Sequence, residues 1–116
     1  MPRYLMLLYD TPADYADLSP QEVQAMIERY SRWSAGLKAE GKSVKGEKLT
    51  DDGGRRLKRS GDKVVAVDGP YAEAKDVIGG YYLIEAADRA EAEAIARTCP
   101  HLHGRNWIEL REIEPT

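Results

Sequence analysis

The stretch from Ser19 to Gly41 constrains the fold more than any other part of the chain, because it carries a complete helix signature. Ser19 fits an N-cap, Pro20 suits the first helical position, and Glu22 completes a Ser-x-x-Glu capping box. Apolar residues then recur at steps of three and four and form one stripe: Val23, Met26, Ile27, Tyr30, Trp33 and Leu37. Gly41 is the expected stop. A helix with a single apolar stripe must bury it against a second layer of structure.

Short apolar or alternating segments elsewhere in the chain predict strands. The expected strands are Tyr4–Tyr9, Ser43–Leu49, Arg55–Arg59, Lys63–Val67, Ile78–Glu85 and Asn106–Ile113. The turn Ser60-Gly61-Asp62 predicts a hairpin, in which the basic first arm would be an exposed edge and the apolar second arm would be buried. The pair Gly79-Gly80 indicates a bulge, or a close approach by another group.

A second helix is expected from Asp88 to Cys99, with Ala92, Ile95 and Ala96 facing inward and Pro100 preventing its continuation. Tyr71 to Asp76 is expected to form about one helical turn. The order strand–helix–strand, hairpin, strand–helix–strand predicts one α+β domain over residues 1–116, in a ferredoxin-like arrangement. Two helices cover only one face of such a sheet, so a homodimer formed through the other face is expected.

Composition excludes several function classes. Seventeen Lys and Arg against 20 Asp and Glu give a net charge of −3, which argues against a general nucleic-acid binder. The single cysteine, Cys99, excludes an internal disulfide and favours a reducing compartment. No apolar run approaches the roughly 20 residues that cross a bilayer, and the charge at Asp10 disfavours a signal peptide. We therefore expect a cytoplasmic protein that binds neither nucleic acid nor membrane.

Asp68 is the first candidate for chemistry, because it ends an apolar strand at the rim of the sheet. A carboxylate there can act as a general base or orient a histidine, and the alternative is that it only caps the following turn. Glu73 and Lys75 beside it could bind a polar ligand or could simply be solvated.

The two histidines, His101 and His103, are separated by one residue and lie in the segment between the second helix and the last strand. A metal site would need more ligands at suitable spacing, so an acid–base arrangement is favoured, with one histidine exposed and the other beside a carboxylate. Cys99 is expected to be a packed thiol rather than a nucleophile. No dinucleotide or phosphate-loop motif is present, and no cofactor or metal is expected.

The stretch from Asp68 to Lys75, Asp-Gly-Pro-Tyr-Ala-Glu-Ala-Lys, followed by Ile78–Ile84, resembles the signature of YCII-related proteins of the DGPF-motif branch. Gly46-Glu47-Lys48-Leu49 is similar to the Gly-Glu-x-Leu step of that family. The resemblance covers essentially the whole chain. It implies a ferredoxin-like fold that forms a dimeric α+β barrel.

For function, the resemblance implies two alternatives. A His–Asp pair has been proposed to give the family an enzymatic role, and one relative takes part in dechlorinating an aromatic intermediate. DGPF-branch members often lie beside genes for sigma factors, which favours regulation instead. This chain departs from the family pattern in two ways: Tyr71 replaces the usual Phe, and the first helix lacks a histidine, which leaves His101 and His103.

The leading hypothesis is a small homodimeric enzyme that acts on a small polar or aromatic molecule by hydrolysis, isomerisation or dehalogenation. Asp68, helped by Glu73 or Glu47, would activate His103 for proton transfer. The expected ligand-binding residues are Glu47, Tyr71, Lys75 and His101. The alternative is a non-catalytic module that binds a metabolite or a sigma-factor-type partner.

Overall fold

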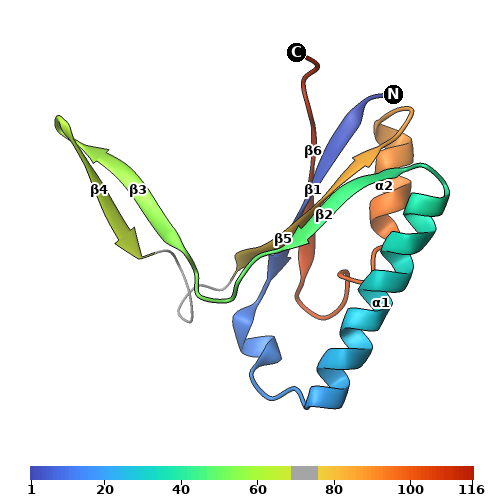
Figure 1. Ribbon diagram of the computed structural model, residues 1–116, viewed down its shortest axis with the longest axis horizontal. Coiled ribbons are helices and arrows are strands. Elements are labelled where there is room, and N and C mark those ends of the chain that lie inside the picture. The colour runs from blue at the N-terminus through green and yellow to red at the C-terminus, as the bar shows by residue number, and fades with distance from the viewer. Residues whose placement is uncertain (69–75) are drawn as a thin grey trace.

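The computed structural model describes residues 1–68 and 76–116, in which a sheet carries two helices on one face (Figure 1). In chain order the elements are β1 (Arg3–Asp10), the 3-10 turn η1 (Pro12–Tyr15), α1 (Pro20–Ala39), β2 (Ser43–Lys48), β3 (Arg55–Ser60), β4 (Lys63–Asp68), β5 (Val77–Glu85), α2 (Arg89–Arg97) and β6 (Trp107–Glu112). The helical turn expected from Tyr71 lies outside the described residues, except for Asp76, which is in no regular element.

Four of the six described strands form an antiparallel sheet in the order β2–β5–β1–β6. β1 is central, and its Leu7 lies opposite Tyr81 of β5 and Glu109 of β6. Two split β-α-β units interleaved in this way give the ferredoxin-like α+β fold, which confirms the prediction.

The pair Gly79-Gly80 introduces the predicted bulge. Leu8 lies opposite Gly80 and Tyr9 lies opposite Ile78, so Gly79 has no counterpart on β1. The extra residue shifts the register of β5 at the end of β1, where Asp10 leaves the sheet.

The core lies between the sheet and the two helices. Met6 and Ile84 are its largest fully buried side chains, and the ring of Trp33 meets that of Tyr82 edge-on with centroids 5.0 Å apart. Cys99 is buried among them, and burial raises the pKa of its thiol to about 11, as expected for a packed cysteine.

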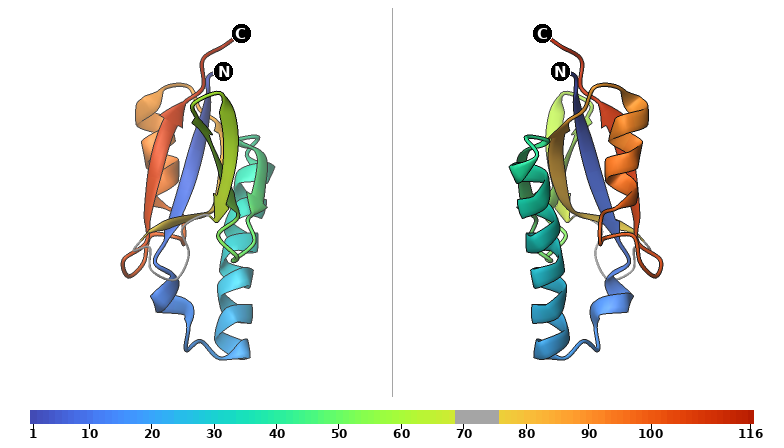
Figure 2. Two further views of the ribbon diagram at one scale, coloured as in Figure 1. Left: turned by 90° about the vertical axis from the view of Figure 1, so that its left-hand side faces the viewer. Right: turned by 90° about the vertical axis from the view of Figure 1, so that its right-hand side faces the viewer.

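The α1 capping box forms as predicted, with Ser19 N–H donating to Glu22 Oε1 and Glu22 N–H donating to Ser19 Oγ, both at 3.1 Å. Only the second half of the apolar stripe covers the core. Val23 and Ile27 are exposed, because the N-terminal half of α1 extends beyond the end of the sheet (Figure 2). Among the described residues, neither α1 nor α2 is long and apolar enough to span a membrane.

β3 and β4 form a separate two-stranded hairpin, and the prediction that its apolar arm Lys63–Val67 is buried is wrong. Val64 is 59% exposed and Val65 is 41% exposed. The reason is the position of the hairpin, which leaves the main sheet on the side opposite the helices (Figure 1), so neither helix covers it.

We expect Ser19→Ala to lower the free energy of unfolding by about 1 kcal/mol, because the Glu22 N–H loses its acceptor. Urea denaturation would measure the change. Ser31→Ala, at an exposed position within the same helix, should leave stability unchanged or raise it slightly, because alanine has the highest helix propensity. Equal losses in the two variants would contradict a stabilising cap.

Candidate functional site

A buried histidine in the α2–β6 loop joins three segments of the chain. His101 is only 2% exposed, and its Nε2 lies 2.9 Å from the carbonyl oxygen of Tyr9 at the end of β1. Its Nδ1 lies 2.8 Å from the hydroxyl of Tyr30 on α1. The imidazole thus connects the central strand, the first helix and the loop that leads to the last strand.

The partners of His101 select the tautomer of its neutral ring. A carbonyl can only accept, so the Nε2–H donates to Tyr9, and Nδ1 of the neutral ring then accepts from the Tyr30 hydroxyl. Burial lowers the pKa of His101, and burial likewise raises the pKa of Tyr30, which keeps that hydroxyl protonated. Both ring nitrogens are therefore occupied by groups of the chain itself.

The carboxylate nearest to His101 belongs to Asp10. Its Oδ1 lies 3.6 Å from His101 Nε2 and accepts a hydrogen bond of 3.3 Å from the Tyr15 hydroxyl. The side chain of Asp10 is 19% exposed, and burial raises its pKa, although His101 and Tyr15 act in the opposite direction. Asp10 is consequently a stronger base than an exposed aspartate while still in contact with solvent.

Asn106 completes the polar cluster at the start of β6. Its Nδ2 donates to the Tyr15 oxygen, so an unbroken series of hydrogen bonds runs from Asn106 through Tyr15 to Asp10. The Oδ1 of Asn106 is buried and has no hydrogen-bond partner among the described residues. Burial is the main cause that raises the pKa of Tyr15 to about 12.

A cavity of about 360 Å³ opens on the outer side of this cluster. Tyr15 and Asn106 form part of its wall, so a ligand in it would lie against two members of this hydrogen-bonded series. The remaining wall combines charged and apolar side chains with one glycine: Asp14, Leu18, Glu22, Ala25, Met26, Arg29, His103 and Gly104. This volume suits a small organic molecule.

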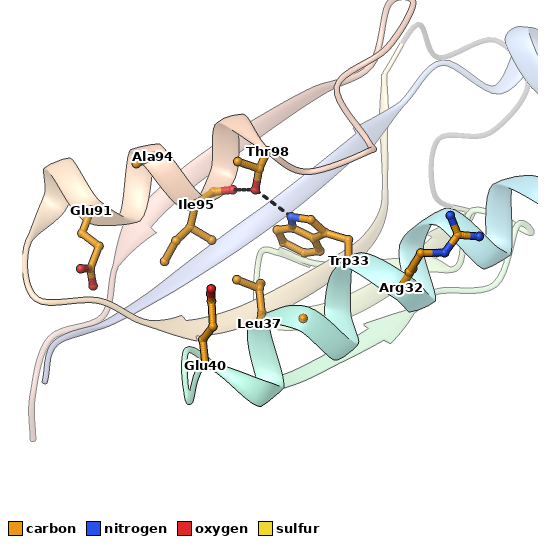
Figure 3. Close-up of a pocket in the computed structure, with 9 residues that line it drawn as sticks. Arg32, Trp33, Leu37, Glu40, Glu91, Ala94, Ile95 and Thr98 are labelled. Atoms are coloured by element: carbon orange, nitrogen blue, oxygen red, sulfur yellow. Dashed lines mark hydrogen bonds between the residues drawn. The ribbon is translucent and has the colours of Figure 1, made fainter.

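A larger hollow of about 440 Å³ lies between α1 and α2 (Figure 3), away from the cluster. Trp33 Nε1 donates to Thr98 Oγ1 at 2.8 Å across it. Glu91 stands at one end, where Lys42 and the backbone of Ala87 hold the pKa of its carboxyl below the usual value. The shift of Glu91 is away from neutrality, so we regard the Asp10 cluster, although its cavity is smaller, as the better candidate site.

Of the residues proposed from the sequence, those that the structure describes lie in three separate segments. Asp68 ends β4 with a 93% exposed side chain, and its Oδ1 lies 3.7 Å from Arg55. His103 is exposed and lines the cavity, whereas Glu47 is on β2 opposite Tyr81. Tyr71, Glu73 and Lys75 lie outside the described residues. The catalytic and ligand-binding roles assigned to all of them stay predictions.

Sequence reasoning did not select Asp10, Tyr15, Tyr30 or Asn106. In the sequence, Asp10 serves only as a charge that disfavours a signal peptide, and Tyr30 only as a member of the apolar stripe of the first helix. The one signal that pointed here was the glycine pair. A Cβ atom at Gly79 would overlap Oδ2 of Asp10, so the expected close approach is that of this carboxylate. Among the described residues, no three His, Cys, Asp or Glu side chains converge as a metal site requires.

The lowered pKa of His101 predicts how stability depends on pH. Below about pH 6.5 the unfolded chain binds a proton that the native imidazole resists, so this contribution is complete above that pH and is lost as the pH falls toward the native pKa. We expect the stability difference between wild type and His101→Gln to shrink from about pH 7.5 to about pH 5. Urea denaturation at each pH measures it. A constant or growing difference would mean that the native ring is protonated.

Gly79→Ala should lower the free energy of unfolding by about 1–3 kcal/mol, because the new methyl group displaces the Asp10 carboxylate from Tyr15. Gly36→Ala is the matched control. Its Cβ would meet nothing within 4 Å, and within a helix the substitution should raise stability by about 0.5–1 kcal/mol. Chemical denaturation distinguishes the two, and a neutral Gly79→Ala would show that Asp10 does not need this space.

The comparison with known protein families agrees with the geometry. The family model described as the YCII-related domain matches residues 2–116, which is nearly the whole chain. A search of the curated proteins finds no match. Membership of the DGPF-motif branch stays a prediction. On this match, the chain belongs to the YCII-related domain family.

Proposed function

We propose that this protein is an acid–base enzyme that moves a proton on a small polar molecule, with Asp10 as the proton-accepting carboxylate. One observation carries the proposal: Tyr15 belongs to the cavity wall, and its hydroxyl donates to a partly buried carboxylate of raised pKa. Partly buried carboxylates of this kind are typical of general bases.

The proton would move in two linked steps. The bound molecule gives its proton to the Tyr15 oxygen, and the original Tyr15 proton passes across 3.3 Å to Asp10 Oδ1. Because its pKa is about 12, Tyr15 stays protonated at neutral pH and acts as a relay rather than as a phenolate. Asn106 donates to the same oxygen and holds the ring hydroxyl in place.

His101 has a different role in this scheme. Its two nitrogens are engaged by Tyr9 and Tyr30, so it is a positioning residue that fixes the end of β1 next to the cavity. Its Nε2–H group also lies close to the Asp10 carboxylate. A nearby donor lowers the desolvation free energy of the partly buried negative charge.

The wall of the cavity supports a substrate that is partly polar and partly apolar, because it combines acidic and basic groups with an apolar surface. Arg29 offers a positive charge, Met26 and Ala25 offer an apolar surface, and His103 offers a further hydrogen-bonding group. Proton abstraction from carbon would give an isomerisation, whereas abstraction from water would give a hydrolysis or a hydrolytic dehalogenation. All three reaction classes use the same relay.

The second candidate is a ligand-binding or regulatory module without catalysis. The observation in its favour is that His101, the group best suited to proton transfer, already has both nitrogens occupied. In that case the cavity would hold a metabolite and the Asp10 cluster would only shape its wall.

We also propose that the protein is a homodimer that pairs through the sheet face opposite the helices. Register places Leu5 and Leu7 of β1 beside Leu83 and Tyr81 of β5 on this face. Tyr9 and Trp107 continue it as a stacked pair, with centroids 3.9 Å apart. A contiguous apolar face of this kind favours a partner surface. A cytoplasmic location stays a prediction.

Asp10→Asn tests the enzymatic proposal. Small halogenated aromatic acids, esters and hydroxy acids would be screened with wild type for halide release, proton release or isomerisation. We expect Asp10→Asn and Tyr15→Phe to lower the rate on any substrate found by about two to four orders of magnitude. Asp10→Asn should retain wild-type thermal stability or exceed it, because it removes a buried charge.

Asp68→Asn is the matched control, since it makes the same change at an exposed carboxylate. Its full activity beside an inactive Asp10→Asn would support the relay. The reverse pattern would restore Asp68 as the catalytic base. If a compound binds the cavity and no turnover is found with wild type, the binding-module alternative is favoured.

A further inference from the structure

We propose that the β3–β4 hairpin is an arm that clasps a second copy of this chain docked against the open sheet face. The inference rests on the proposed homodimer and goes beyond it, because it assigns a role to a segment that the ferredoxin-like core does not use. Three observations carry it: the exposure, the position and the charge of the hairpin.

The hairpin has little support within its own subunit. Its strands pair with each other from Arg55 opposite Asp68 to Ser60 opposite Lys63, and neither makes an extensive contact with any other described helix or strand. Leu57 is 69% exposed. An isolated two-stranded hairpin is marginally stable in water. The apolar side chains on this ribbon therefore indicate a surface that becomes covered by another molecule.

The position of the hairpin favours a second copy as that molecule. The radius of gyration is 16.1 Å, whereas about 13 Å is expected for a chain of this length. The larger radius of gyration reflects the hairpin, which projects from the sheet on its open-face side (Figure 1). A molecule bound to the open face would therefore lie next to the hairpin. A copy placed on that face by a two-fold axis would lie beside the arm, and its own arm would lie beside the first subunit.

Charge also favours a second copy. The hairpin carries five basic residues and only two acidic ones, Asp62 and Asp68, while the whole chain carries a net charge of −3. The remainder of the chain is therefore acidic. On the open face itself the charges are mixed: Glu47 and Glu109 lie opposite Tyr81 and Leu7, and Lys45 and Arg111 lie opposite Leu83 and Leu5. The basic hairpin and the remainder of a second copy therefore carry opposite net charges, whereas the acidic remainder would repel a nucleic acid.

Sedimentation velocity over a dilution series tests the proposal on the full chain. We expect wild type to dimerise, and Leu57→Asp/Val64→Asp to raise the dimer Kd by about tenfold or more. Both side chains are exposed within the subunit, so the variant should fold, which circular dichroism would verify. Val23→Asp/Ile27→Asp is the matched control, because it places the same two charges at exposed apolar sites on α1 and should leave Kd unchanged.

A third variant separates the arm from the sheet-face dimer. Leu7→Asp should dissociate the dimer by charging the centre of the open face. If Leu7→Asp dissociates the dimer but the hairpin variant does not weaken it, the arm proposal is overturned and the sheet-face dimer stands. A wild type that stays monomeric at all concentrations overturns both. Binding of a labelled DNA duplex that Arg56→Glu/Arg59→Glu abolishes would assign the arm to a polyanion and likewise overturn the proposal.

Discussion

A single neutral imidazole fixes the end of the central strand to both helical units of this fold. His101 can donate to the Tyr9 carbonyl and accept from the Tyr30 hydroxyl at the same time only while Nδ1 carries no proton. The adjacent Asp10 favours the protonated ring, yet burial outweighs it, and the pKa of His101 is lowered. The geometry of the candidate site depends on that balance, because Asp10 directly follows the residue that His101 holds.

The site also requires a residue without a side chain at position 79. The bulge in β5 places Gly79 against the Asp10 carboxylate, where any larger residue would occupy the same space. That carboxylate has Tyr15 as its hydrogen-bond donor, with His101 slightly farther away. Burial is the main cause of the raised pKa of Asp10, and it outweighs the opposite effects of His101 and Tyr15.

The fold could be predicted almost completely, because its signals are local. The Ser19 capping box and the strand periodicities act within a few residues, and their order leads to the ferredoxin-like topology. The exposure of Val64 and Val65 could not be predicted, since β-branched residues indicate a strand but not what covers it. The Asp10–His101 contact joins the two ends of the chain, and no periodicity reports such a pair; only the glycines at 79 and 80 indicated that something approaches there.

The reactivity of the single cysteine, Cys99, reports local opening of the structure around His101. Cys99 is two residues from His101, in the segment where α2 gives way to the loop that the imidazole ties to β1. Its thiol is shielded and its pKa is about 11, so in the closed state a thiol reagent finds neither access nor thiolate. Any motion that releases the loop would expose the sulfur to the reagent. The rate of thiol modification would then follow the frequency of this local opening. The rate at which a thiol reagent modifies Cys99 thus measures how often the hydrogen bond between His101 and the Tyr9 carbonyl opens.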